Sequence, residues 1–190
     1  MRKKQSTVLF IIFLLPLVIW CGMRIYASIQ FDRSAGGNIK RAADANTVEL
    51  AKKELETVLK YLDDNNITSG YTSVIYTTPD EDIEFWHKNL KSSLEKLNAL
   101  SPQATQLEET NVLLKLRETL LDSGDKDRVT APKGISIYPN NGLYAATGIF
   151  TLLFSLLSLF YLPKNTDLTP TEIYIFLVIA GIVILIILGK

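Results

Sequence analysis

The sequence contains few of the side chains that most often carry chemistry, with one cysteine and one histidine among 190 residues. A single cysteine cannot form a disulfide within the chain, and zinc sites use three or four side chains, mostly cysteine and histidine. The chain also has no net charge, since 20 basic residues balance 20 acidic ones, so it shows no electrostatic preference for nucleic acid. We therefore expect no metal, no cofactor and no nucleic-acid partner.

Hydrophobic residues make up 47% of the chain and are concentrated at its two ends. Basic residues in the segment 1–7 precede an apolar stretch over 8–29, in which Arg24 is the only charge. At about 1.5 Å per residue, this stretch can cross roughly 30 Å of hydrocarbon, and Arg24 can extend its charged group to the headgroups. A cleaved secretory signal also fits. The small residues of a cleavage site are scarce, so the pattern favours an uncleaved transmembrane helix.

Two further apolar stretches, over 143–162 and 171–189, predict a second and a third transmembrane helix. The loop 163–170 between them contains two prolines and Lys164, which suits a short hairpin connection. Basic residues in short flanking segments favour the cytoplasmic side. We therefore predict a bacterial inner-membrane protein whose N-terminus and short loop are cytoplasmic, and whose residues 30–142 form an extracytoplasmic domain.

The segment 30–142 has the composition of a soluble helical domain, with 14 basic and 18 acidic residues. It opens with the small residues 34–38, which predict a flexible joint. Apolar residues then recur at spacings of three and four, which predicts a helix over 39–63 with a heptad seam. That seam consists of Val48, Ala51, Leu55, Val58 and Leu62.

Two more helices are predicted by proline-containing start signals. Thr78, Pro79 and Glu81 have the order of a cap, a first-turn proline and a capping-box partner. The buried stripe of this helix is predicted to be Ile83, Trp86, Leu90, Leu94 and Leu97. Ser101 and Pro102 repeat the signal, and the third helix has the apolar residues Leu107, Val112, Leu113, Leu114, Leu116, Leu120 and Leu121. A short connection between the two helices predicts that they are antiparallel.

Two segments of the domain favour extended structure. Aromatic and β-branched residues predominate over 71–77, and Ile135 and Ile137 alternate with polar residues before Pro139. We hypothesise that 71–77 pairs with 135–139. The predicted fold class is a mainly α membrane protein with three transmembrane helices and an extramembrane antiparallel three-helix bundle, to which two short paired strands are added.

No residue pattern predicts a catalytic or metal site. The single histidine, His87, adjoins an apolar helix stripe without a nucleophile at a suggestive spacing, so a structural or surface role is the simpler interpretation. The acidic residues over 80–84 do not follow the order of a calcium loop. They suit the start of a helix, where negative charge is favourable.

Aromatic residues between Gly70 and Trp86 are the predicted partner contact, because aromatic side chains dominate protein interfaces. They are Tyr71, Tyr76, Phe85 and Trp86. The alternative is that these side chains fill the open end of the bundle.

These observations predict a non-catalytic membrane protein, an accessory or scaffold subunit that contacts lipid and another membrane protein or a second copy. The alternative is an extracytoplasmic sensor or ligand-binding module. A helical bundle between two membrane helices resembles, in architecture only, the input domains of bacterial chemoreceptors and sensor kinases. Such domains require a cytoplasmic output domain, so we expect a sensor of this kind to signal through a partner. A third hypothesis is a membrane enzyme that uses scattered carboxylates and tyrosines. No motif in the sequence supports it.

Overall fold

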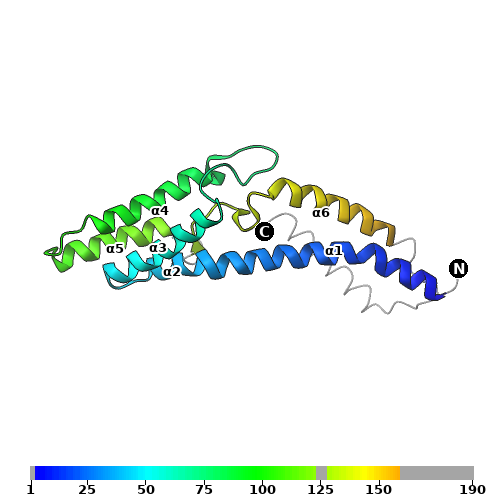
Figure 1. The fold of residues 1–190 in the computed structure, drawn as a ribbon, viewed down its shortest axis with the longest axis horizontal. Helices are drawn as coiled ribbons and strands as arrows, with labels where there is room; N and C mark the ends of the chain where they lie inside the picture. Colours follow the sequence, from blue (N-terminus) through cyan, green and yellow to red (C-terminus); the bar gives the residue numbers. More distant parts are fainter. Residues whose placement is uncertain (1–2, 123–127, 159–190) are drawn as a thin grey trace. The chain divides into compact units, whose positions relative to one another are not determined.

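The computed structural model describes residues 3–122 and 128–158, and this part of the chain is mainly helical (Figure 1). It divides into two compact units, which we call the apolar unit (Met1–Ala27 with Asn140–Lys190) and the helical domain (Ser28–Pro139). The α-helices are α1 (Lys3–Phe31), α2 (Gly37–Ala43), α3 (Val48–Asp64), α4 (Ile83–Asn98), α5 (Gln106–Leu120) and α6 (Asn141–Leu156). The remaining elements are the π-helical turn η1 (Asp32–Gly36), the 3-10 turns η2 (Pro79–Glu81) and η3 (Ile135–Ile137), and strands β1 (Leu121–Asp122) and β2 (Arg128–Val129).

One helix in the described part of the chain is long and apolar enough to cross a membrane, and it runs from Val8 to Ala43. Its most apolar window is only 17% buried, whereas the core helix of a soluble protein is buried on most sides. Helix α6 is apolar but shorter. The predicted span 143–162 extends beyond the described residues, and the predicted span 171–189 lies outside them entirely. The structure thus supports membrane association through one N-terminal helix.

The predicted flexible joint at 34–38 is wrong, because helix continues through it. The π-helical turn η1 connects α1 directly to α2, and the Asn38 side chain donates a 3.0 Å hydrogen bond to the Ser34 carbonyl. Gly37 suits this position because it has no side chain and not because of its backbone flexibility. A Cβ atom here would lie 3.0 Å from the Asp32 carbonyl oxygen. The membrane-type helix therefore becomes the first helix of the helical domain without a break.

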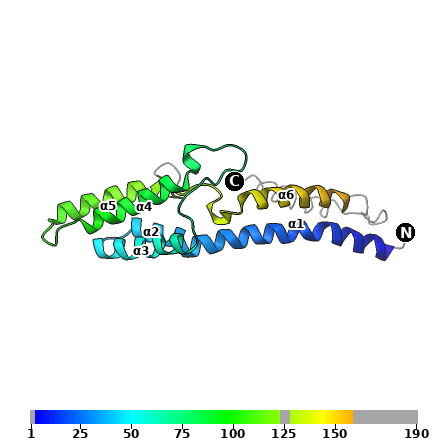
Figure 2. The same cartoon turned by 45° about the horizontal axis from the view of Figure 1, so that its top comes forward.

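The helical domain differs from the predicted three-helix bundle because the predicted helix over 39–63 is two helices. Chain direction reverses at Asp44, and Thr47 caps α3 by accepting a 3.3 Å hydrogen bond from the Leu50 amide. Helix α2 packs against α3 and α5, while α4 packs against α3 and α5 (Figure 2). The domain core is therefore enclosed by four helices within the described residues.

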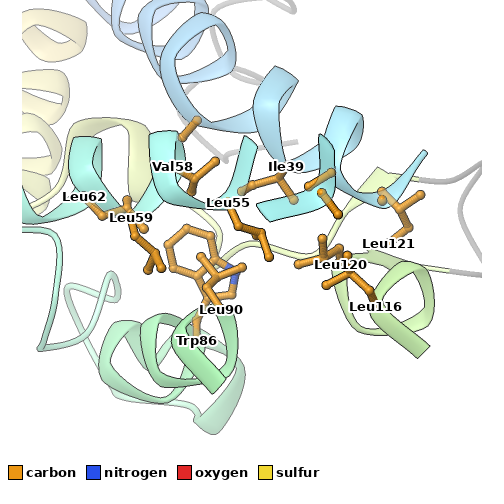
Figure 3. Close-up of a cluster of buried hydrophobic side chains, with 14 of the residues drawn as sticks. Ile39, Leu55, Val58, Leu59, Leu62, Trp86, Leu90, Leu116, Leu120 and Leu121 are labelled. Carbon is orange, nitrogen blue, oxygen red and sulfur yellow. The ribbon is translucent and has the colours of Figure 1, made fainter. Parts of the chain in front are cut away.

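The core of the helical domain contains the apolar residues that the helical periodicity identifies. The whole heptad seam of α3 is buried, as are Ile83, Trp86, Leu90 and Leu97 of α4 (Figure 3). On α5 only Leu116 and Leu120 are buried, and Leu107 and Leu114 are exposed. The seam and the α4 stripe are confirmed, apart from Leu94, which is only partly buried.

Both predicted helix starts are displaced. Helix α4 is capped by Asp82, whose carboxylate accepts a 3.1 Å hydrogen bond from the Phe85 amide, and the Thr78 hydroxyl donates to Glu81 within η2 instead. Helix α5 begins after Thr105 rather than Ser101. In each case a second capping residue is available nearby. The helix begins at the one that lets its apolar stripe face the core.

The hypothesised pairing of 71–77 with 135–139 is also wrong. The paired strands are β1 and β2, which are antiparallel with Leu121 opposite Val129. Residues 135–137 form the turn η3, and Tyr71 makes an isolated bridge to Asp82. The Tyr138 hydroxyl instead donates a 2.6 Å hydrogen bond to the carbonyl of Ser69, which lies two residues before the first predicted segment.

Candidate interaction surfaces

Trp86, one of the four predicted contact residues, belongs to the core. Its side chain lies between α3 and α4 beside Leu55 and Leu90 (Figure 3), and the residue is 8% exposed. The indole nitrogen donates a 2.5 Å hydrogen bond to the carbonyl of Thr130. Trp86 therefore fills the bundle, as the alternative interpretation of the aromatic residues supposed.

The other three predicted contact residues point outward. Phe85 is 63% exposed on α4, and Tyr71 and Tyr76 are exposed in the loop that leads to η2. This loop also exposes Val74 and Ile75, although their β-branched side chains are equally typical of a buried strand. We call residues 71–77 the apolar loop. Its role, and the contact role of the aromatic residues, stay predictions.

The apolar loop is fixed at its base rather than loosely attached. The Ile83 amide donates to the Gly70 carbonyl at 2.9 Å, and the Thr72 amide donates to the Glu81 carbonyl at 3.1 Å. Gly70 has a φ of +97° and lies so close to Tyr138 that a Cβ atom would overlap its hydroxyl. The positive φ and the close approach together require glycine at this position.

A second surface feature, absent from the sequence prediction, is an apolar groove between α4 and α5. The groove has a volume of about 400 Å³. Its lining includes Leu97, Leu100, Val112 and Leu116, with Lys96 and Lys115 at its edge. The sequence signal that could have found it is the apolar content of α5, which exceeds what one buried face of a helix requires.

The polar groups of the helical domain make structural contacts. His87 Nε2 lies 3.2 Å from an Asp63 carboxylate oxygen and so connects α4 to α3. Buried Glu54 pairs with Arg41 at 2.6 Å, joining α3 to α2. Within residues 3–122 and 128–158, no three histidine, cysteine or acidic side chains gather closely enough to hold a metal ion.

The shifted pKa values of the helical domain have local causes. Burial raises the pKa of Tyr61, whose ring packs edge-on against Phe31 with centroids 6.5 Å apart. A hydrogen bond from Lys88 to Glu84, one helical turn earlier, raises the pKa of that lysine. Perturbed groups mark a functional site when they converge in a cleft, and these two groups belong to separate structural contacts.

The apolar unit contains its own close helix contact. Trp20 of α1 is buried, and its indole nitrogen donates a 3.0 Å hydrogen bond to the Tyr144 carbonyl of α6. One turn further along α6, a Cβ atom at Gly148 would lie 2.7 Å from the Trp20 ring. Small residues permit this kind of close helix packing in membranes. Along the same pair, Phe13 and Phe154 have ring centroids 4.8 Å apart.

No protein-family model, curated protein or solved structure matches this chain.

Proposed function

We propose that the chain is a non-catalytic membrane protein, an accessory or scaffold subunit of a larger assembly. In this proposal α1, α6 and a third helix over 171–189 cross a bacterial inner membrane, the N-terminus is cytoplasmic, and the helical domain is extracytoplasmic. The helical domain binds another membrane protein. The observation that carries the proposal is the apolar groove between α4 and α5.

The groove has the properties of a helix-binding site. Leucine and valine side chains from α4, α5 and the connection between them contribute to its lining, and an amphipathic helix can place apolar anchors in such a groove. The amino groups at the edge favour a partner with acidic residues beside its apolar stripe.

The test uses the full chain in native membranes, with a photo-reactive amino acid in place of Val112. A matched control carries the same amino acid in place of Lys91, which is exposed on α4 and is not among the groove residues. We expect a discrete cross-linked membrane protein from position 112 alone. Charge reversal by Lys96→Glu with Lys115→Glu should abolish the adduct while the helical content stays unchanged.

Different products would change the proposal in different ways. An adduct of two copies of this chain would make the groove a self-association site. A chain that is folded in the membrane and yields no protein adduct from position 112 would contradict the scaffold proposal.

A sensor is the second candidate, and the unbroken helix from Val8 to Ala43 favours it. A continuous helix can transmit a rotation or a shift along its axis. Insertion of one alanine between Ser28 and Ile29 would rotate the two parts of this helix by about 100°. A scaffold should keep its groove adduct after the insertion, whereas a sensor should lose the ligand dependence of its coupling to the partner.

A further inference from the structure

The apolar loop exposes consecutive large apolar side chains to an unusual degree. Ile75 is 92% exposed, Tyr76 is 74% exposed and Val74 is 52% exposed. Isolated exposed apolar residues are ordinary on protein surfaces, whereas contiguous ones mark a contact with another apolar phase. The sequence around them is uncharged from Asn65 to Pro79, so transfer of the loop out of water would not strip water from an ionised side chain.

The conformation of the loop holds these side chains outward. Thr72, which precedes them, is buried, and its amide is bonded to Glu81. The loop then projects as an open turn beyond the start of α4 before the chain enters η2 (Figure 1). The apolar tip is thus presented on a fixed base, and this lowers the conformational entropy that binding would cost.

The base of the loop is attached to the segment that leads to the second apolar helix. Tyr138 donates to the Ser69 carbonyl at 2.6 Å, and α6 begins at Asn141, three residues later. A short chain segment therefore joins the loop's anchor to an apolar helix. Because α6 is proposed to cross the membrane, the lipid bilayer is the apolar phase that lies nearest along the chain to the base of the loop.

We propose that Val74, Ile75 and Tyr76 insert into the headgroup–acyl boundary of the bilayer as a lipid anchor of the helical domain. Valine and isoleucine supply the apolar contact, and tyrosine suits the interface because its ring is apolar and its hydroxyl is polar. The ligand is a lipid surface. This inference rests on the proposed membrane insertion of α1 and α6.

The test measures lipid contact at single sites in the full chain. Cys21, the only cysteine, is replaced by alanine, and single cysteines are introduced by Ile75→Cys, Ile12→Cys and Gln103→Cys. Each variant is labelled with an environment-sensitive dye and reconstituted into phosphatidylcholine vesicles that contain lipid with a doxyl quencher near its carbonyl groups. Position 12 lies in α1, and position 103 lies in the exposed connection between α4 and α5.

We expect severalfold stronger quenching at position 75 than at position 103, close to that at position 12. Quenching at position 12 without quenching at position 75 would overturn the lipid anchor while the membrane proposal stands. An absence of quenching at position 12 would overturn both. Protection of position 75 from aqueous iodide without quenching by doxyl lipid would also overturn the anchor, because it identifies a protein contact instead.

Discussion

The indole nitrogen of Trp86 donates a hydrogen bond to the carbonyl of Thr130, 44 residues later in the chain. This bond fastens the segment after β2 to the first turn of α4. The Thr130 hydroxyl donates to the Thr119 carbonyl at 2.9 Å, so the same residue also contacts the end of α5. One buried side chain therefore links the core to the segment that continues toward Tyr138.

Replacement of this side chain tests how much the link stabilises the helical domain. We expect Trp86→Ala to lower the free energy of unfolding by about 3–5 kcal/mol, because it removes a large buried side chain. Trp86→Phe retains most of the apolar contact and leaves the Thr130 carbonyl unpaired, so we expect a loss of about 1–3 kcal/mol. Urea unfolding of the full chain in detergent, followed by circular dichroism, measures both values.

Phe85→Ala is the matched control, because Phe85 is the adjacent residue and is exposed. We expect a change within about 0.5 kcal/mol. Equal losses from Trp86→Ala and Phe85→Ala would show that Trp86 is not a core residue.

Local periodicity predicted the buried faces of α3 and α4 better than it predicted the bounds of the helices. The seam from Val48 to Leu62 lies on one face of α3 and is buried throughout, because spacings of three and four leave one face apolar in any helix. The helix starts were less predictable. Thr78 and Asp82 can both cap, and the choice depends on which register directs Ile83 into the core, which no local pattern encodes.

Contacts between segments far apart in the chain could not be predicted from the sequence. Tyr138 and Ser69 are 69 residues apart, and the sequence-based hypothesis placed a strand ladder at 71–77 instead of one side-chain hydrogen bond just before it. The groove between α4 and α5 depends on the separation of two helices. Sequence periodicity gives the faces of each helix and does not give that separation.

Gly70 and Tyr138 form the contact that fixes the base of the apolar loop, and Gly70→Ala should disrupt it. Alanine would be strained at a φ of +97° and would overlap the tyrosine hydroxyl. We expect a loss of about 1–3 kcal/mol in the free energy of unfolding. Tyr138→Phe, which removes only the hydrogen bond, should cost about 0.5–1.5 kcal/mol.

The same urea titration measures both variants, and proteolysis within 71–77 reports the loop directly. Gly70→Ala should make the loop easier to cleave at unchanged helical content. Native-like stability and protection in Gly70→Ala would contradict the contact.

The capping box at the start of α5 predicts a pH-dependent contribution to stability. The Thr105 amide donates to the Glu108 carboxylate at 2.8 Å, and the Thr105 hydroxyl donates to it at 3.0 Å. These bonds favour the ionised carboxylate and lower the pKa of Glu108 from its ordinary value of 4.5. Its stabilising contribution is therefore complete above pH 4.5 and is lost as the pH falls through the lower folded-state pKa.

Glu108→Gln should make the free energy of unfolding depend less on pH in the acid range. The amide oxygen of glutamine can accept the hydrogen bonds from Thr105 and does not titrate. Thr105→Ala should cost about 1 kcal/mol at neutral pH. Thr110→Ala is its control, since that hydroxyl bonds only within α5. Thermal unfolding across the acid range measures all three, and an unchanged acid slope in Glu108→Gln would contradict the assignment.

Gly148 is predicted to set the distance between α1 and α6. A Cβ atom there would lie 2.7 Å from the Trp20 ring, whereas one at Gly142 on the same helix would meet nothing within 4 Å. Buried Cys21, beside Trp20, is the only thiol in the chain, so its rate of maleimide labelling reports separation of the two helices. Gly148→Leu should therefore label severalfold faster than the parent chain and Gly142→Leu. Equal rates in the two variants would show that α6 does not pack on Trp20.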